Sequence, residues 1–394
     1  MQADFPLPDD DALRLSGELA ALIRAEIAAQ GGAIPFSRYM ERCLYTPGLG
    51  YYSAGSTKFG AAGDFTTAPE LGPLFAGCVA QAVAPVLQRL GPEAGFLEIG
   101  GGSGAFAEIM LKRLLELDAL PSRYAILEPS ADLRERQRER LGERLIPPVF
   151  DLVEWLDRPP EARWDGVLFA NEVIDALPTP RFTLREGEVY EECVALDGQG
   201  GLVRSDRPAD ALLTAAVRHV ERYLERSFPD GYRSELLSQL PYWLQAVMGG
   251  LDKGAMLFAD YGHPRREFYL PERDTGTLRA FYRHRVHADA YLWPGLQDLT
   301  ASVDFTALAE AGTGAGFDLS GYATQASFLL GNGLQDRLAE AEARASEATL
   351  LRLRNEAKRL TLPSEMGERF QLMGFERDVE FSAAFLLNDL SWRL

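Results

Sequence analysis

Four glycines directly after a short apolar run constrain the fold of this chain more than any other feature. The run FLEIGGGSG is followed by AFAEIMLKRLLEL, whose apolar residues recur at helical spacing. A buried strand, a tight turn and a helix in this order form the start of a nucleotide-binding α/β unit. Gly100, Gly102 and Ala105 fit the dinucleotide pattern G-x-G-x-x-G/A. A second pattern, E-x-G-x-G-x-G, is associated with S-adenosylmethionine (SAM), and it matches Glu98, Gly100, Gly102 and Gly104. The glycines alone leave both nucleotides open.

Apolar strands and helices alternate along the chain after this turn. The predicted strands are FLEIG, RYAILEP ending at Glu128, RLIPPVFD ending at Asp151, WDGVLFAN ending at Asn171, GAMLFAD ending at Asp260, DLSGYATQ and ERFQLMGFER. A separate hairpin, RFTLREGEVYEECVAL, shows a period of two and turns at Gly187. Continuous apolar strands that alternate with helices predict an α/β fold with a mostly parallel sheet covered on both faces.

The two nucleotides demand opposite electrostatics at the turn. A dinucleotide brings a doubly negative pyrophosphate to the helix N-terminus, whereas SAM carries a sulfonium and an ammonium cation. Carboxylates follow the predicted strand ends, where a doubly wound sheet binds its ligand: Glu98, Glu128, Asp151, Glu172 with Asp175, and Asp260. The turn itself contains no lysine or arginine, and the Walker lysine is absent. The sequence therefore favours SAM over NAD, although strand-end carboxylates also occur as ordinary helix caps.

Composition indicates a globular protein that does not bind nucleic acid. The formal net charge is −18, whereas nucleic-acid binding requires a basic face. Cys43, Cys78 and Cys193 lie far apart and form no C-x-x-C pair, which fits a reducing compartment. The acidic start MQADFPLPDDD lacks the features of a signal peptide, and no uncharged apolar run approaches the length of a membrane span. We therefore expect a cytoplasmic protein without membrane insertion; the oligomeric state is not indicated.

Six motifs together resemble one known family. They are IPFSRYMERCLYTPGLGYY, GDFTTAPELGPLF, LEIGGGSG, ANEVIDALP, FADYGH and DLTASVDF, in this order. The chain resembles the MidA-like SAM-dependent methyltransferases over residues 34–370. The mitochondrial member of that family is an assembly factor for respiratory complex I that methylates an arginine of a complex subunit. GDFTTAPE and NEVIDALP are much more specific signals than the glycine turn.

The resemblance implies a class I, Rossmann-like methyltransferase core with a seven-stranded sheet whose last strand is antiparallel. Residues 1–92 would form an N-terminal helical extension, and residues 93–394 the core, with insertions at about 180–250, 264–304 and 330–365. The implied activity is SAM-dependent methyl transfer to a protein, at an arginine side chain. Methylation of a small molecule, a non-catalytic SAM-binding assembly factor and an NAD-dependent oxidoreductase are the alternatives.

The resemblance also implies which residues bind SAM. The glycine turn and Glu98 would lie near the methionine part, Glu128 near the ribose hydroxyls and Asp151 near the adenine amino group. The complete set of implied cofactor-binding residues is Gly63, Asp64, Phe65, Glu98, Gly100, Gly102, Gly104, Glu128, Asp151 and Asn171. Where the family commonly has proline in the turn, this chain has Gly101, which we expect to loosen the turn slightly.

Three residues are candidates for catalysis. The ANEVIDALP motif would place Glu172 beside the methyl donor, where a carboxylate can hold a guanidinium group, with Asp175 as a helper. His263 follows the fifth predicted strand and is the third candidate. A metal site at the nearby histidines is disfavoured, because no cysteine completes a ligand set. The aromatic residues of the stretch 268–293 either line a peptide channel or pack the interior of a long insertion.

Overall fold

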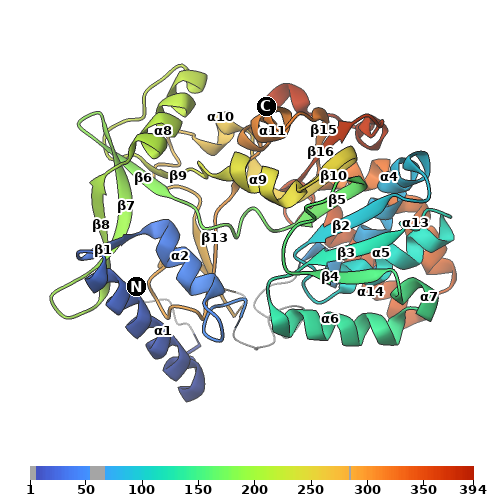
Figure 1. Cartoon of the computed structure of the whole chain (residues 1–394), viewed down its shortest axis with the longest axis horizontal. Coiled ribbons are helices and arrows are strands. Elements are labelled where there is room, and N and C mark those ends of the chain that lie inside the picture. Colours follow the sequence, from blue (N-terminus) through green and yellow to red (C-terminus); the bar gives the residue numbers. More distant parts are fainter. Residues whose placement is uncertain (1–5, 54–66, 284) are drawn as a thin grey trace. The chain divides into compact units, whose positions relative to one another are not determined.

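The structure, a computed structural model, describes residues 6–53, 67–283 and 285–394, and the chain divides into two compact units. The core unit consists of Thr66–Val173, Leu240–Pro264 and Val303–Leu394. The accessory unit consists of Met1–Phe65, Ile174–Gln239 and Arg265–Ser302. Figure 1 labels the elements of both units. This division differs from the expected boundary at residue 92, since residues 66–92 belong to the core unit.

The core unit contains a twisted, mostly parallel sheet. Among its described strands, β16 alone runs antiparallel to its neighbours. A short additional strand, β14 (Val303–Asp304), pairs in parallel with β10. The strand order across the sheet is β15 (Asp318–Thr324), β16 (Phe370–Arg377), β10 (Leu251–His263), β5 (Trp164–Asn171), β2 (Gly95–Ile99), β3 (Arg123–Leu127) and β4 (Val153–Leu156). This order confirms the Rossmann-like fold predicted from the sequence.

Helices cover both faces of the core sheet. On one face α4 (Leu74–Leu90) and α5 (Ala105–Glu116) share the largest hydrophobic cluster with Leu257 of β10. The next residue, Phe258, points to the other face and contacts Trp243 of α9 (Leu240–Met248), with ring centroids 6.5 Å apart. Most residues of α4 are buried, as expected for a helix that is apolar all round. The other core helices are α3 (Ala68–Leu71), α6 (Ala131–Arg144), α7 (Pro147–Phe150), α11 (Phe305–Gly314), α12 (Gln325–Gly331), α13 (Leu334–Ala343) and α14 (Glu347–Thr361).

One predicted strand of the core is wrong. The segment RLIPPVFD forms the short helix α7 instead, because its two prolines occupy the first helical turn, where a missing backbone N–H costs nothing. Proline also cannot donate to a central strand ladder. The strand that follows β3 in the sheet is VEWL, Val153–Leu156, which pairs in parallel with β3.

The accessory unit is built on two antiparallel sheets. The hairpin predicted around Gly187 is present as β6 (Arg181–Arg185) and β7 (Glu188–Leu196), and Gly187 has a φ of 81°. The first sheet has the order β1 (Ala33–Pro35), β7, β6 and β9 (Arg233–Glu235), with β8 (Leu202–Pro208) paired to β7. The second sheet has the order β12 (Arg285–His287), β11 (Arg279–Tyr282) and β13 (Asp298–Thr300), within the insertion expected at 264–304.

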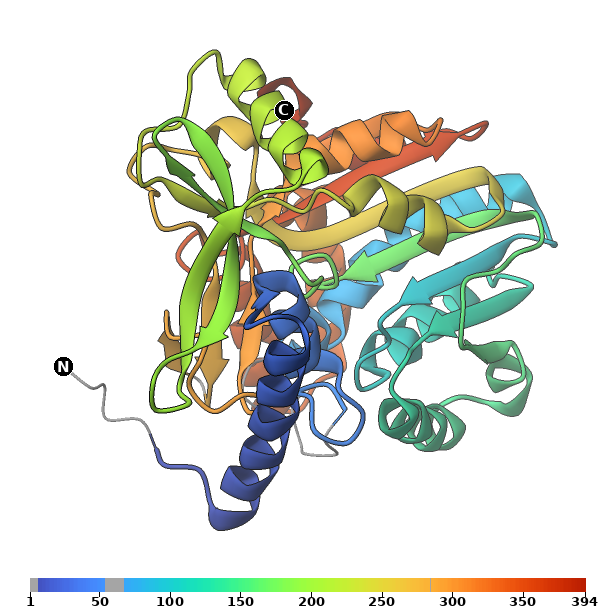
Figure 2. The same cartoon turned by 60° about the vertical axis from the view of Figure 1, so that its left-hand side comes forward.

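Helices from distant parts of the chain complete the accessory unit. They are α1 (Asp10–Ala29), α2 (Phe36–Tyr45), α8 (Ala211–Leu224) and α10 (Arg265–Phe268). Figure 2 shows α1 in blue beside the green strands, and it contacts both β1 and β7. The buried side of α1 repeats every fourth residue at Leu19, Ile23 and Ile27, which is helical spacing.

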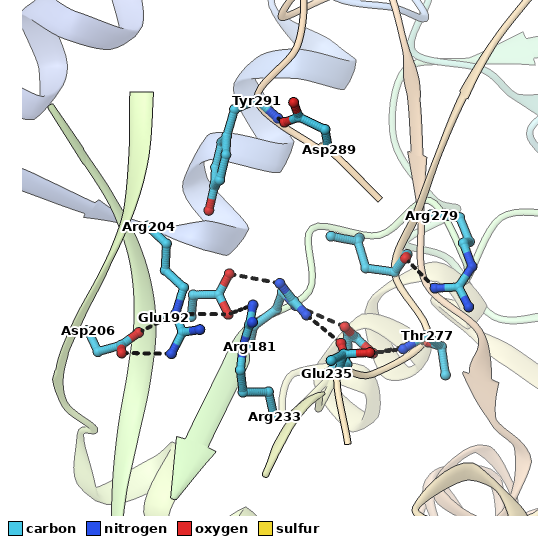
Figure 3. A network of polar contacts seen from close by, with 12 residues as sticks. Arg181, Glu192, Arg204, Asp206, Arg233, Glu235, Thr277, Arg279, Asp289 and Tyr291 are labelled. Atoms are coloured by element: carbon cyan, nitrogen blue, oxygen red, sulfur yellow. Dashed lines mark hydrogen bonds and ion pairs between the residues drawn. The ribbon is translucent and has the colours of Figure 1, made fainter. Parts of the chain in front are cut away.

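A buried ion network ties the strands of the accessory unit together (Figure 3). Arg181 of β6 is 6% exposed and lies between Glu192 of β7 at 2.7 Å and Glu235 of β9 at 2.9 Å. Arg233 donates to Glu192 at 3.0 Å, and the backbone N–H of Thr277 donates to Glu235 at 2.6 Å. Removing one partner of such a buried pair typically costs about 3–5 kcal/mol, because the remaining charge is left uncompensated. The network therefore acts as a structural clamp.

Candidate active site

Parallel strands of the core sheet end together at one edge. Ile99, the last residue of β2, lies opposite Leu127 of β3 and Ala170 of β5. Asn171, the last residue of β5, lies opposite Ala259 of β10. The segments that follow these strands therefore begin at one level. In an open α/β sheet, this carboxyl edge is where ligands bind.

The glycine turn after β2 adopts a backbone that other residues resist. Gly100, Gly102 and Gly104 have φ values of 73°, 51° and 80°. A Cβ atom added at Gly102 would meet no atom of the described residues within 4 Å, so this side of the turn is open among them. A Cβ atom added at Gly101 would lie 2.7 Å from Ile126 Cγ2 and 2.9 Å from Gln137 Nε2. Glycine at position 101 therefore lets the turn pack closely on its neighbours, which differs from the loosening that we expected.

Gln137 of α6 connects three parts of the site. Its side chain is fully buried, and its Nε2 donates to the carbonyl oxygen of Gly102 at 2.8 Å and to Glu128 Oε2 at 3.4 Å. Trp155 of β4 donates from Nε1 to Gln137 Oε1 at 2.9 Å. The amide thus fixes the glycine turn, the end of β3 and the neighbouring strand relative to one another.

Gln137 was not predicted from the sequence, although a signal for it was present. In the otherwise charged helix LRERQRERL, Leu133, Gln137 and Leu141 are spaced four apart and are its buried residues. This spacing places the three on one side of the helix. A neutral amide at the central position of that stripe indicates a buried polar contact.

Glu128 lies directly after β3, where the ribose contact was expected. It is 4% exposed and accepts a hydrogen bond from the backbone N–H of Ser130 at 3.0 Å. Burial raises the pKa of Glu128 to about 7, while the hydrogen bonds from Ser130 and Gln137 oppose this rise. A carboxylate at this position can accept the two hydroxyls of a ribose.

Glu98 lies one residue inside β2 and supports the turn from within the sheet. It is 3% exposed and accepts a hydrogen bond from the Tyr124 hydroxyl at 2.7 Å. Burial raises the pKa of Glu98 to about 8, with the Tyr124 hydrogen bond opposing and the charge of Glu128 adding to the rise. The expected contact of Glu98 with a ligand ammonium group stays a prediction.

The last part of the GDFTTAPE motif is fixed to the glycine turn. Ser103 in the turn donates from its hydroxyl to Glu70 of α3. Arg140 of α6 donates to the Ser103 hydroxyl at 3.3 Å and to Glu108 of α5 at 2.9 Å. These contacts join α3, the turn, α5 and α6 around the start of α5. Gly63, Asp64 and Phe65 of the same motif lie outside the described residues.

The end of β5 holds Asn171 and Glu172 in a constrained geometry. Glu172 has a φ of 53°, a left-handed conformation that is uncommon for residues other than glycine. Its backbone N–H donates to the carbonyl oxygen of Ala259 at 2.9 Å, which holds it there. Asn171 Nδ2 donates to Glu172 Oε1 at 3.1 Å, and the buried Asn171 Oδ1 has no hydrogen-bond partner among the described residues. Backbone strain of this kind concentrates at functional sites.

Strand β10 brings two further candidate residues to the carboxyl end of the sheet. Asp260 is 1% exposed, and its carboxylate accepts a hydrogen bond from the backbone N–H of Tyr261 at 2.9 Å. His263 is the last residue of β10 and lies opposite Asp304 of β14.

The assignment of adenine binding to Asp151 does not hold. Asp151 is exposed and follows α7, so it precedes β4 and lies at the amino edge of the sheet rather than the carboxyl edge. The acidic residue that follows β4 is Asp157, which is paired with Arg134 of α6. The error came from the misassigned strand.

The chain matches a family of S-adenosyl-L-methionine-dependent methyltransferases (Methyltransf_28) over residues 78–323. It belongs to this family. The matched span includes the glycine turn and the ends of β3, β5 and β10.

Relatives of this methyltransferase cover most of its length. The protein arginine methyltransferase NDUFAF7 homolog, mitochondrial, of Drosophila melanogaster is 28% identical over 386 residues, with 91% of this chain and 84% of the relative covered. Protein arginine methyltransferase NDUFAF7, mitochondrial, of Homo sapiens is 28% identical over 370 residues, with 86% and 79% covered. A crystal structure of a Burkholderia thailandensis protein bound to S-adenosyl-homocysteine is 42% identical, with a TM-score of 0.91 over 99% of this chain and 100% of that one. The fold, the methyltransferase class and the SAM cofactor predicted from the sequence are confirmed.

In this methyltransferase, Asp175, the expected helper of Glu172, belongs to the accessory unit, whereas Glu172 belongs to the core unit. Asp175 is 4% exposed, and its carbonyl oxygen accepts a hydrogen bond from the backbone N–H of Ala301 at 3.0 Å. The structure therefore assigns the two acidic residues of the ANEVIDALP motif to different units, although three positions separate them in the chain.

The described ranges contain neither a metal-binding cluster nor a membrane-spanning helix. No group of three or more histidine, cysteine, aspartate or glutamate side chains there is arranged to hold a metal ion, and His284 lies outside these ranges. None of the helices within the same ranges is both long enough and apolar enough to cross a bilayer.

Proposed function

We propose that this methyltransferase transfers the methyl group of SAM to an arginine side chain of a protein. The observation that carries the proposal is Glu172, held in a left-handed conformation at the end of β5, on the same sheet edge as the glycine turn. The names of the curated relatives, which are protein arginine methyltransferases, support the same acceptor.

We infer that the carboxyl edge of the core sheet holds the cofactor. The open side of the turn at Gly102 leaves room for the methionine part, and Glu128 accepts the ribose hydroxyls. Asn171 Oδ1, a buried acceptor, is available to the ammonium group, and Asp157 replaces Asp151 as the acidic residue nearest the adenine. Buried carboxylates such as Glu98, Glu128 and Asp260 favour a cationic ligand and disfavour a pyrophosphate.

Glu172 would prepare the acceptor for attack. Arginine stays protonated, so its guanidinium is a poor nucleophile until it is positioned and polarised. A carboxylate can accept two N–H groups of one guanidinium side by side, which fixes its plane and leaves the third nitrogen to attack. When bound, SAM supplies a methyl group activated by the sulfonium charge. The new N–C bond forms as the C–S bond breaks, and the proton lost from nitrogen passes to the carboxylate or to water.

Two alternative functions and the cellular location of the protein can be tested. Methylation of a small molecule uses the same core chemistry, and a non-catalytic SAM-binding assembly factor would retain the cofactor site without turnover. A cytoplasmic location is part of the proposal, whereas the curated relatives are named as mitochondrial.

One experiment separates these functions. The purified protein is incubated with SAM carrying a tritiated methyl group and with protein extract from cells that lack the gene. We expect tritium in methylarginine after acid hydrolysis of the extract proteins. Label in small molecules alone would favour the first alternative, and SAM binding without any transfer would favour the second. Thermal stabilisation by SAM, roughly 2.7 kcal/mol at a hundredfold excess over Kd, and none by NAD, is the control for ligand identity.

A further inference from the structure

A guanidinium group of the core unit packs directly on the backbone of a neighbouring helix. Arg337 of α13 lies so close to Gly77 of α4 that a Cβ atom added at Gly77 would be 2.9 Å from Arg337 Cζ. Glycine weakens a helix interior, because it loses more conformational freedom on folding than other residues. Helices α4, α5 and α13 all belong to the core unit (Figure 1). The missing side chain at position 77 therefore makes room for Arg337.

The guanidinium of Arg337 is buried without a hydrogen-bond acceptor. Its Nε and Nη1 atoms are shielded from solvent, and neither has a partner among the described residues. Burial, followed by the charge of Arg113, lowers the pKa of Arg337. A buried N–H group without an acceptor destabilises the folded protein, and a buried charge without a partner does so more strongly. An acceptor supplied by a ligand would relieve this penalty.

A second arginine lies near the first. Arg113 of α5 pairs with Glu116 at 2.8 Å and donates from Nη2 to Gln81 of α4 at 3.1 Å. Its buried Nε has no partner within the part of the chain that the structure describes. Gln81 follows Gly77 by four positions on α4, so both arginines lie against one side of that helix. Two cations thus bring three buried nitrogen atoms without acceptors to this side: Arg113 Nε, Arg337 Nε and Arg337 Nη1.

The acidic groups near the two arginines do not fill this gap. Glu116 and Glu340 partly oppose the effects that lower the pKa of Arg337. The Glu116 side chain is 57% exposed and Glu340 is exposed on α13, so solvent screens both charges. Burial raises the pKa of the neighbouring Cys78 thiol to about 12, so this thiol stays neutral.

The two guanidinium groups select an anion with several acceptor oxygens. A carboxylate is planar and pairs side by side with one guanidinium. A phosphate group is tetrahedral, so its oxygens can accept from two guanidinium groups that come from different helices. Arginine is also the side chain that proteins favour for phosphate recognition.

We propose that Arg113 and Arg337 form a binding site for a phosphate group beside Gly77, between α4, α5 and α13. Arg113 follows Ala105, the first residue of α5, by eight positions, so about 12 Å of helix separates it from the glycine turn. The site is therefore distinct from the cofactor site, and it goes beyond the methyl transfer proposed above.

Arg337→Met is the first test, because it removes the charge and every N–H group of this side chain while keeping a long, flexible chain. Calorimetry with inorganic phosphate, at an ionic strength held constant with sodium chloride, should show saturable binding to the wild-type protein. Arg337→Met should weaken this binding by at least about tenfold, as expected for lost hydrogen bonds to a charged group. Arg344→Met, which removes an exposed cation at the end of the same helix, is the matched control and should keep wild-type affinity.

Gly77→Ala tests the same site without changing any charge. The added methyl group would take the position of the Arg337 guanidinium, which can swing away because it is the end of a flexible side chain. Alanine is also the better helix former, so we expect the Tm in the absence of phosphate to stay the same or rise. Phosphate affinity should fall about tenfold. An unchanged Kd for S-adenosyl-homocysteine in each variant checks that the core is intact.

Two further ligands define the chemical class. Glycerol phosphate bound as tightly as inorganic phosphate would assign the site to the phosphate group of a larger molecule, and binding of inorganic phosphate alone would assign it to the free ion. Both results support the proposal, whereas acetate bound as tightly as phosphate would contradict it. Absence of phosphate binding throughout the millimolar range, or wild-type affinity in both Arg337→Met and Gly77→Ala, would overturn the site and leave the proposed methyl transfer unaffected.

Discussion

The side-chain amide of Gln137 donates a 2.8 Å hydrogen bond to the carbonyl oxygen of Gly102, at the centre of the glycine turn. Helix α6, which follows β3, thereby holds the turn that follows β2. A ligand contacting both Glu128 and the turn meets a surface whose two parts are already fixed. Such preorganisation increases affinity because less ordering is required on binding.

We expect Gln137→Leu to weaken SAM binding by about tenfold and to reduce the free energy of unfolding by about 1–3 kcal/mol. The substitution keeps similar volume but leaves the Trp155 indole and the Gly102 carbonyl without their partner. Calorimetry with S-adenosyl-homocysteine and urea unfolding give the two quantities. Gln88→Leu is the control, since Gln88 bonds a loop carbonyl in an exposed position. Unchanged ligand affinity in Gln137→Leu would show that the turn does not depend on this amide.

Substitutions at neighbouring glycines should separate folding from ligand binding. Gly101→Ala places a Cβ against Ile126 and Gln137, so we expect a loss of stability of about 1–3 kcal/mol. Gly102→Ala points into open space and, apart from the modest cost of its positive φ, should keep the fold while reducing SAM affinity. Thermal unfolding and ligand titration of both variants measure the two effects, and unchanged SAM affinity in Gly102→Ala would show that the ligand lies elsewhere.

Glu172→Gln tests the role of charge at the end of β5. The substitution keeps the shape and an oxygen for the Asn171 amide but removes the negative charge. If Glu172 clamps the acceptor, methyl transfer to arginine should fall by roughly 10²–10³ while SAM affinity changes little. Glu186→Gln is a matched control, because Glu186 also has a positive φ, 51°, but lies in the exposed β6–β7 turn. A parallel loss of SAM binding and transfer would make Glu172 a cofactor ligand instead.

Stability in the absence of ligand should fall as pH rises from about 5 to 8. Burial raises the pKa of Glu98 to about 8 from an ordinary value of 4.5, so the folded protein binds this proton more tightly than the unfolded chain. The free energy of unfolding therefore decreases with pH over this range. Glu98→Gln should remove a large part of that decrease, on the order of 2–4 kcal/mol. Urea unfolding at several pH values, with exposed Glu116→Gln as control, measures it. An unchanged slope would mean that Glu98 is ionised in the folded protein at pH 5.

Local signals account for the parts of the fold that the sequence predicted. The strands β2, β3, β5 and β10 are continuous apolar runs that end in a polar residue or glycine, and the hairpin at Gly187 follows from its period of two. The apolar run before Asp151 resembled them, but its two prolines start a helix. The two prolines decided the secondary structure of this segment, and a prediction from hydrophobicity alone was wrong.

Non-local contacts account for most of what the sequence did not reveal. The carboxylates at the ends of β3 and β5 were predicted because strand ends are local, and parallel pairing brings them together. Gln137 was missed because its importance depends on how α6 lies against the turn. The hydrogen bond from the Tyr52 hydroxyl to Asp298 joins residues more than two hundred positions apart, so no window of sequence displays it.

Segments of the two units alternate along the chain, so the accessory unit is completed only late in synthesis. The hydrophobic cluster of the accessory unit joins Leu44 in α2 to Leu299 in β13, so about 250 residues are translated between them. At about 5–20 residues per second, the N-terminal helices leave the ribosome roughly 10–50 s before their packing partners exist. During that interval Leu19, Ile23 and Ile27 can pack only against the neighbouring β1 and α2, because Leu299 has not yet been synthesised. The hydrophobic cluster around α1 is therefore completed only when the last third of the protein emerges.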